Sequence, residues 1–324
     1  MLAGSTRILL SEYSKVTSLS KLLFRRGFVG GNAWIQAIGM QTPALIHAHF
    51  FSDGLDAAIL SEKLDLPLVT TVHGHDITKY ENAVSQNPVN RRFFEKVDRV
   101  IAVSDFIARQ ALAKGCPEHK LVQHYIGIDL DKFTQSKHET DRPSLLFVGR
   151  LVEKKGCTYL LQALEQLKTN YPDLSLTIIG EGELKASLQQ EVIARHLNVE
   201  FIGSASAVEV REQLARCWLF VAPSITAANG DAEGLGMVFL EAQALQTPVV
   251  SFRSGGLVEA VEEETTALLS EEKDVAGLAD NIASLLENST LRHNMGVEGR
   301  KRVEEHFDIR QQCAKLELIY DGLC

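Results

Sequence analysis

The sequence predicts an α/β protein built from two doubly wound domains. Its 324 residues exceed the roughly 250–300 residues at which a single hydrophobic core stops growing. Hydrophobic residues make up 45% of the chain and charged residues 23%, a balance typical of globular proteins and unlike that of disordered chains. Short apolar runs alternate with segments of helical periodicity, which is typical of parallel sheets covered by helices.

The alternation is clearest after residue 143. Strand-length runs that are apolar on both faces indicate a buried parallel sheet. Such sheets bind ligands at the carboxyl ends of their strands, so the loops after the strands are the expected place for chemistry. The predicted strands are 145–148, 174–179, 199–202, 218–222 and 248–252, and the predicted helices are 158–168, 183–196, 208–216, 238–245, 291–305 and 309–323.

The first part of the chain repeats this pattern less completely. The polar, proline-containing stretch 136–143 is the predicted linker. We therefore expect a first domain over 1–143, a second domain over 144–306, and a terminal helix within 307–324 that packs back toward the first domain. In the first domain the predicted strands are 44–49, 66–72 and 97–103, and the predicted helices are 53–64 and 105–114.

Charge and cysteine content narrow the function classes. The formal net charge of −9 argues against a nucleic-acid-binding protein, which normally carries a basic surface. Residues 1–143 carry 17 basic and 15 acidic side chains, whereas residues 144–324 carry 16 and 27, so the two domains are expected to meet different partners. The five cysteines form no CxxC pair, and the first residues show no signal-peptide pattern. We therefore expect a cytoplasmic protein.

The segment LLFVGRLVEKKG carries the first candidate site residues. A buried strand ends at Gly149, and Arg150 and Lys155 follow in the loop. Arginine offers a planar fork of donors and lysine a point charge, and both suit a diphosphate. Either residue alone could equally be a solvated base at the start of a helix. The segment IIGEG places Gly180 at a tight strand-to-helix turn, which by itself favours a structural role.

The segment DAEGLGMVFLEA carries the second set. Gly234 and Gly236 stand just before an apolar segment of helical periodicity, whose first backbone N–H groups would be unpaired and ready for a phosphate. Glu241 would lie inside that helix among apolar neighbours, so its carboxylate needs donors such as ribose hydroxyls. Glu233, eight residues earlier, would stand at the mouth of the helix beside a sugar attached to the diphosphate.

Two HxH motifs at strand ends support a different class of function. His47 and His49 form the first motif, and His73 and His75 form the second, which Asp76 follows. Paired motifs of this kind with an aspartate could bind zinc or form the two-metal centre of a hydrolase. Such a centre needs further ligands from later strands, and the second half has no cluster of that kind. We therefore favour histidines that line a cleft over metal ligands.

Together these segments resemble the retaining glycosyltransferases of family 4. These have the GT-B fold, in which two doubly wound, Rossmann-like domains face each other across a cleft. GRLVEKKG, IIGEG, VAPS, EGLGMVFLEA and PVVSFRSGG resemble the donor-binding domain, in order and spacing, over residues 144–324. HAHF, VTTVHGHDIT, VIAVSDF and GIDLDKF resemble the acceptor domain. The segments HGHD and ITAANGDAEG are most similar to those of exopolysaccharide transferases of the colanic-acid and amylovoran type.

The resemblance implies retaining transfer of a sugar from a UDP- or GDP-sugar to a glycan or lipid-linked acceptor, in exopolysaccharide or lipopolysaccharide assembly. It implies that Arg150 and Lys155 hold the diphosphate, that Glu233 binds the donor sugar and that Glu241 binds the ribose. It implies no metal, even at the DLD triplet of GIDLDKF, and no cofactor besides the donor. The candidate catalytic residues are His73, Arg150, Lys155 and Glu233, and the candidate substrate-binding residues are Asp76, Gly180, Gly234, Leu235, Gly236 and Glu241.

The start of the chain departs from the family pattern. Family members open with a strand and a glycine-rich turn, whereas this chain reaches HAHF by residue 47, so we expect the first domain to lack its opening portion. A chain of this kind could also be a remnant that binds nucleotide sugar and transfers little. The basic, apolar segment 15–28 is either a surface helix or a face that contacts anionic lipid as a peripheral membrane protein would.

Overall fold

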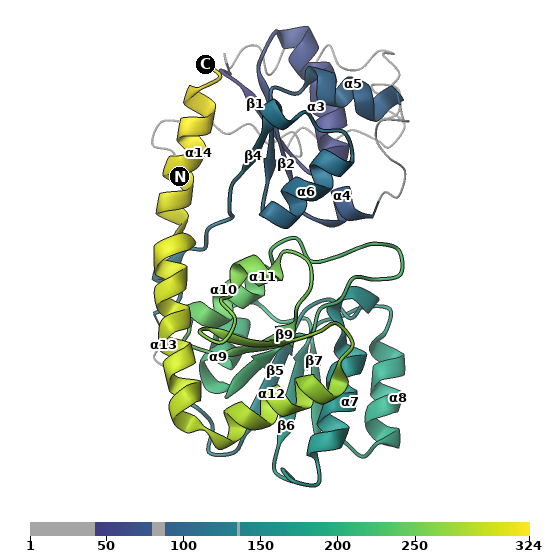
Figure 1. Ribbon diagram of the computed structural model, residues 1–324, viewed down its shortest axis with the longest axis vertical. Coiled ribbons are helices and arrows are strands. Elements are labelled where there is room, and N and C mark those ends of the chain that lie inside the picture. Colours follow the sequence, from purple (N-terminus) through teal and green to yellow (C-terminus); the bar gives the residue numbers. More distant parts are fainter. Residues whose placement is uncertain (1–42, 80–87, 135–136) are drawn as a thin grey trace.

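The structure, a computed structural model, describes residues 43–79, 88–134 and 137–324, which form two α/β domains stacked along the long axis (Figure 1). Each domain contains a parallel sheet, so the predicted fold class is confirmed. The expectations for segment 15–28 and for the opening of the first domain concern residues outside the described ones, and they stay predictions. Within the described ranges, no helix is both long and apolar enough to span a membrane.

The first domain has a four-stranded parallel sheet in the order β1-β2-β3-β4. All five residues of β2 are buried, because helices cover this central strand. On one face, Phe51 packs against Phe93 and Phe94, with ring centroids 4.8 and 5.8 Å apart. The strands are β1 (Ile46–His49), β2 (Leu68–Val72), β3 (Arg99–Ala102) and β4 (Leu121–Gln123), and the helices are α3 (Phe51–Leu64), α4 (His75–Thr78), α5 (Pro88–Lys96) and α6 (Asp105–Ala113).

The second domain has a six-stranded parallel sheet in the order β10-β9-β8-β5-β6-β7. β5 pairs with β6 on one side and β8 on the other, and this switch point is where open α/β sheets bind ligands. The strands are β5 (Ser144–Val148), β6 (Ser175–Ile179), β7 (Val199–Gly203), β8 (Leu219–Val221), β9 (Val249–Phe252) and β10 (Ala267–Ser270). The helices are α7 (Cys157–Leu167), α8 (Lys185–Ala194), α9 (Ala207–Arg216), α10 (Met237–Ala244), α11 (Leu257–Ala260) and α12 (Val275–Glu287).

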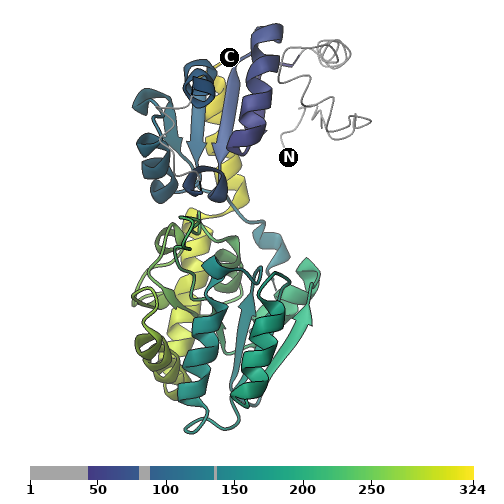
Figure 2. The same ribbon diagram turned by 90° about the vertical axis from the view of Figure 1, so that its right-hand side faces the viewer.

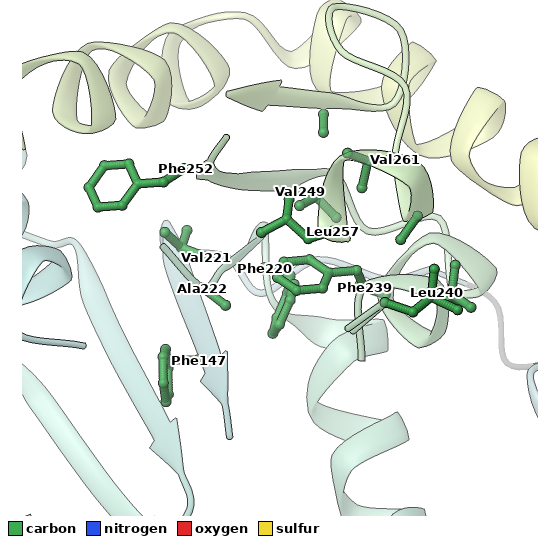
Figure 3. Packing of buried hydrophobic residues seen from close by; sticks show 14 of the residues in the cluster. Phe147, Phe220, Val221, Ala222, Phe239, Leu240, Val249, Phe252, Leu257 and Val261 are labelled. Carbon is green, nitrogen blue, oxygen red and sulfur yellow. The ribbon is translucent and has the colours of Figure 1, made fainter. Parts of the chain in front are cut away.

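Helix α10 is anchored on the sheet of the second domain by aromatic packing. Phe239 of α10 meets Phe220 of β8 edge to face, with ring centroids 5.4 Å apart (Figure 3). Both side chains are completely buried, and burying a phenylalanine side chain contributes roughly 1.5–3 kcal/mol. This packing fixes the direction in which the N-terminus of α10, with its candidate site residues, points.

Two helices at the C-terminal end, α13 (Ser289–His306) and α14 (Ile309–Asp321), run along one side of both domains (Figure 1 and Figure 2). Between them, the N–H of Ile128 donates to the carbonyl of Phe307 (2.8 Å), and the N–H of Ile309 donates to the carbonyl of Ile128 (3.0 Å). Near its end, α14 reaches β1, where the Tyr320 hydroxyl and Nδ1 of His47 are 2.5 Å apart. Helix α14 therefore joins the second domain to the first.

The predicted strands and helices are all present, with bounds shifted by a few residues. The prediction missed β4, α4, α5, β10, α11 and α12. The stretch proposed as a linker is held against the second domain: the N–H of Thr140 donates to the carbonyl of Arg216 (3.0 Å), and Glu139 pairs with Arg292 (2.9 Å).

Candidate active site

The carboxyl ends of the two sheets face each other, and the loops that follow the strands touch there. Gly234, in the loop after β8, lies directly against the end of β2: a Cβ atom on Gly234 would stand 1.8 Å from the carbonyl oxygen of His73. From the end of β3, the Ser104 hydroxyl donates to the carbonyl of Gly234 over 2.6 Å. Only glycine fits at position 234 in this arrangement, so the predicted site residue is also a contact point between the domains.

A second contact between the domains involves Glu259 of α11. Its carboxylate accepts hydrogen bonds from the backbone N–H groups of Asp105 (2.6 Å) and Phe106 (2.8 Å) at the start of α6, and from the Tyr125 hydroxyl (3.3 Å). The first N–H groups of a helix have no partner inside the helix and favour a negative charge. One domain therefore supplies the cap for a helix of the other, which the sequence analysis did not anticipate.

Lys155 and Glu233 form the centre of the candidate donor site. The ammonium of Lys155 lies 2.5 Å from Oε2 of Glu233, and the two side chains are 14% and 13% exposed. Burial alone would raise the pKa of Glu233, but the positive charges of Lys155, Lys154 and Arg150 lower it below its usual value. Glu233 is therefore a carboxylate at neutral pH. Arg150, which is exposed, adds positive charge from the adjoining loop.

A second ion pair lies beneath the first. The ammonium of Lys154 is 2.8 Å from Oδ1 of Asp231 and also donates to the carbonyl of Ala232 over 3.3 Å. Both side chains are about nine-tenths buried, at 8% and 10% exposure. The sequence analysis did not single out Lys154.

Glu241 lies in α10, as predicted, and its carboxylate has no hydrogen bond or ion pair with the residues the structure describes. Burial raises its pKa, and the charge of Arg211 offsets part of this effect. The helix begins after Gly236, whose φ of +83° favours glycine. A half-buried carboxylate without donors is unfavourable, so Glu241 is suited to accept hydroxyl groups of a ligand.

Gly180 and Leu235 have close packing roles. A Cβ atom on Gly180 would stand 1.9 Å from the carbonyl oxygen of Gly149, so this glycine lets the loops after β5 and β6 lie side by side. The side chain of Leu235 is 3% exposed and belongs to the hydrophobic core. Contact of Leu235 with a ligand would therefore come from its backbone. That Gly180 and Leu235 touch substrate stays a prediction.

Three histidines of the first domain, His47, His49 and His73, lie in a row with their rings in contact. Nε2 of His73 lies 3.0 Å from Nδ1 of His49, and the ring of His49 stacks on that of His47 at 4.5 Å. Nε2 of His47 lies 2.7 Å from the Thr71 hydroxyl. Burial, and then the charge of His49, lowers the pKa of His73 to about 4 and that of His47 to about 3. The rings of His73 and His47 are therefore uncharged at neutral pH.

Behind these rings, between the first sheet and α14, lies a pocket of about 240 Å³. Four imidazoles line it, and its remaining walls are largely apolar, including Ile101, Val103 and Leu316. Because His73 belongs both to this pocket and to the contact with Gly234, the pocket adjoins the candidate donor site.

Asp76 supports the turn that carries His73. Its side chain is 4% exposed, and its carboxylate accepts hydrogen bonds from the backbone N–H groups of Phe51 (3.0 Å), His73 (3.1 Å) and Gly74 (2.8 Å). These three bonds fix the turn that carries His73. That Asp76 also contacts substrate stays a prediction.

The structure does not favour the alternative of a metal-dependent hydrolase. No group of three or more His, Cys, Asp or Glu side chains in the described part of the chain is arranged to hold a metal ion. The ring of His73 bonds to that of His49, and the ring of His47 bonds to Thr71 and Tyr320. In the DLD triplet, Asp131 pairs with Arg310 over 2.5 Å, at the junction with α14.

Comparison with known proteins identifies the family. The description "Glycosyl transferases group 1" matches residues 129–302, and "Glycosyltransferase Family 4" matches residues 10–132. The putative colanic acid biosynthesis glycosyltransferase WcaL of Escherichia coli is 31% identical over 277 residues, which cover 84% of this chain and 68% of that protein. The amylovoran biosynthesis glycosyltransferase AmsK of Erwinia amylovora is 30% identical over 244 residues, which cover 74% and 60%.

A solved structure shows the same fold. The crystal structure of Anabaena Alr3699/HepE in complex with UDP superposes with a TM-score of 0.79 at 21% identity, covering 90% of this chain and 81% of that chain. This likeness, together with the two parallel sheets, confirms the predicted GT-B fold.

Proposed function

The chain belongs to the group 1 glycosyltransferases, and we propose that it transfers a sugar from a nucleotide-diphosphate sugar to a glycan or lipid-linked acceptor. One observation carries this proposal: Lys155 and Glu233 form a nearly buried ion pair at the mouth of α10, with Arg150 beside them. A diphosphate needs fixed positive charge, and a sugar needs a carboxylate that accepts its hydroxyl groups. The pair supplies both within one small volume of an otherwise acidic domain.

The site residues divide the donor between them. Arg150 and Lys155 hold the diphosphate and stabilise the charge that develops on it as the sugar leaves. Backbone N–H groups at Gly234, Leu235 and Gly236, at the start of α10, add partial positive charge. Glu241, which lacks a partner among the described residues, accepts the ribose hydroxyls, and Glu233 accepts hydroxyls of the sugar.

We propose that transfer retains the anomeric configuration by attack on the same face that the diphosphate leaves. Glu233, tied to Lys155, is poorly placed as a nucleophile, so the departing diphosphate takes the proton of the acceptor hydroxyl. The protein then acts mainly by positioning the reactants and stabilising charge. His73, uncharged at neutral pH, receives the acceptor hydroxyl as a hydrogen-bonding partner. Arg150 and Lys155 supply the positive charge, so no metal ion is required.

The names of the relatives support a role in making exopolysaccharide, since one is named for colanic acid biosynthesis and the other for amylovoran biosynthesis. Lipopolysaccharide is a related product class. The UDP bound to the structural neighbour supports a UDP-sugar donor, with a GDP-sugar as the alternative. We place the reaction in the cytoplasm, at the inner face of the membrane where a lipid-linked acceptor would be met.

The proposal is tested first by binding and then by transfer. A ligand that binds only the folded state raises the thermal midpoint. We expect at least one UDP-, GDP- or ADP-sugar to raise the Tm of the intact protein, and the corresponding free sugar to leave it unchanged. NMR of the product formed from the bound donor would then give the anomeric configuration. Binding without transfer would favour the nucleotide-sugar-binding remnant, and no response to any donor would contradict the proposal.

A further inference from the structure

We infer that the buried ion pair of Lys154 and Asp231 positions the two central donor-site residues, Lys155 and Glu233. The inference rests on the proposed function and gives a role to two residues outside the predicted site. The two ion pairs lie side by side: Lys154 and Lys155 are consecutive, and Asp231 and Glu233 are two residues apart. Lys154 and Asp231 do not face solvent, so solvation of a surface does not explain their charges.

Lys154 forms hydrogen bonds with both ends of the loop 225–233. Its backbone carbonyl accepts the N–H of Ile225, at the start of the loop, over 2.8 Å. Its ammonium bonds to Asp231 and to the carbonyl of Ala232, at the end of the loop. Because the next residue along the chain is Lys155, one backbone segment holds the loop and carries the lysine that the loop must meet.

The loop between these ends is supported on two sides. On one side, the Glu153 carboxylate accepts the N–H of Ala228 over 3.1 Å. On the other side, a Cβ atom on Gly230 would stand 3.2 Å from the carbonyl oxygen of Thr78, so the loop tip lies against α4 of the first domain. The loop is therefore held between the domains, and its anchor at Lys154 decides where Glu233 stands in the cleft.

The charges explain why a lysine and an aspartate are used. Asp231 neutralises Lys154, so Lys154 neither competes with Lys155 for Glu233 nor draws a diphosphate away from it. A buried charge that loses its partner is strongly unfavourable, whereas replacing both charges by apolar groups is often tolerated. A single substitution of Lys154 or Asp231 could therefore unfold the protein as well as displace Glu233. The double substitution keeps the fold and tests the position of Glu233 alone.

The test is the double variant Lys154→Met/Asp231→Leu, measured beside wild type. We expect it to fold with a Tm near that of wild type, and kcat with the best donor to fall about 100-fold, because Glu233 is displaced from its working position. Hydrogen exchange of the loop 225–233, measured without any donor, should become faster. The conservative Lys154→Arg variant should keep most of the wild-type kcat.

A matched control is the double variant Arg292→Met/Glu139→Gln, which removes another largely buried ion pair, between α13 and the linker. It should leave kcat and the exchange of the loop unchanged. Wild-type kcat in the Lys154/Asp231 double variant, or an equal loss in the control, would overturn the positioning role. Unchanged hydrogen exchange of the loop 225–233 would overturn its anchoring by Lys154, and this result does not depend on whether the protein transfers sugar. Absence of transfer in wild type is a separate result, which contradicts the proposed function.

Discussion

The two sides of the cleft handle charge in opposite ways. On the second domain, charged side chains meet as buried pairs, Lys155 with Glu233 and Lys154 with Asp231. On the first domain, the strand ends carry imidazoles that burial keeps neutral, including His73 with a pKa of about 4. Both sides are the carboxyl edge of a parallel sheet, so the fold does not explain the contrast. The contrast supports a division of roles, in which the second domain binds a diphosphate and the first domain binds an uncharged hydroxyl group.

The domains are also joined by a contact that crosses this division. Glu259 places a carboxylate at the N-terminus of α6, and the Ser104 hydroxyl bonds to the backbone of Gly234. The loop that carries Glu233 therefore touches both sheets' ends. We expect the largest effect from the loss of Lys155, a smaller one at the Gly234 contact, a smaller one again at Glu241, and the smallest on the neutral side.

Lys155→Ala removes the cation that meets Glu233, and we expect the largest loss here. Turnover should fall about 100- to 1,000-fold, as when one electrostatic stabiliser of a transition state is removed. The measurement is steady-state kcat of the purified variant, with circular dichroism to show that it is folded. Lys168→Ala, which removes a lysine of 41% side-chain exposure on the surface, is the control. Near-normal kcat in a folded Lys155→Ala variant would refute this role.

Gly234→Ala tests the contact between the sides. The added methyl group would meet the carbonyl oxygen of His73, so the domains must move apart, and we expect kcat/KM to fall about 100-fold because the reactants are misplaced. Each domain should still fold. Gly322→Ala, where a Cβ atom would stand 3.7 Å from its nearest neighbours, is the matched control. Equal activities of the two variants would show that the domains need not touch at Gly234.

Glu241→Gln should weaken donor binding about tenfold, since a hydrogen bond to a charged group contributes about 1.5–3 kcal/mol. It should also stabilise the protein without donor, because burial raises the pKa of this carboxyl and its ionised form is unfavourable there at neutral pH. Calorimetric titration and urea unfolding measure the two effects. Glu212→Gln, at an exposed position on α9, should change neither. Unchanged donor affinity would remove Glu241 from the site.

On the neutral side, we expect the smallest effect, on stability against pH. The pKa of His47 falls from its usual 6.5 to about 3 in the folded state, because of burial and then the charge of His49. The unfolded chain therefore binds more protons below pH 6.5, and the free energy of unfolding should decrease as the pH is lowered from 6.5 toward 3. His47→Gln should reduce this decrease by about 1 kcal/mol or more at pH 5.

Urea unfolding at several pH values measures this decrease. His306→Gln, at a side chain of 53% exposure, is the control and should leave it unchanged. An identical pH dependence of wild type and His47→Gln would show that His47 is not kept neutral by burial.

Much of the second domain was predictable because its strands are apolar on both faces and its helices have clear periodicity. The missed strand β10 (Ala267–Ser270) is only partly buried in its middle, and it follows a run of glutamates, so it has no strand pattern of its own. The missed helix α5 begins at Pro88 and carries two arginines, and its two buried phenylalanines become recognisable as core only against Phe51.

Candidate site residues could be predicted where a side chain by its chemistry needs a partner. The partner itself could not be predicted where the fold brings it from a distant part of the chain. Glu241 and Lys155 follow from chemistry that the sequence displays. The pairing of Lys155 with Glu233 joins positions 78 residues apart, and that of Glu259 with Asp105 joins positions 154 apart, so neither can be read from spacing. The bonds of Asp76 to backbone N–H groups could not be predicted either, because in a sequence such a buried carboxylate looks like one that binds substrate.

The central claim is that Lys155 and its neighbours take the diphosphate of a sugar donor. The most direct measurement is the release of nucleoside diphosphate when the full chain is incubated with the donor that raises its Tm most and with a glycan acceptor. We expect release that depends on the acceptor and falls about 100-fold or more in Lys155→Ala. Release that is absent in wild type with every nucleotide sugar, or equal in the variant, would contradict the account.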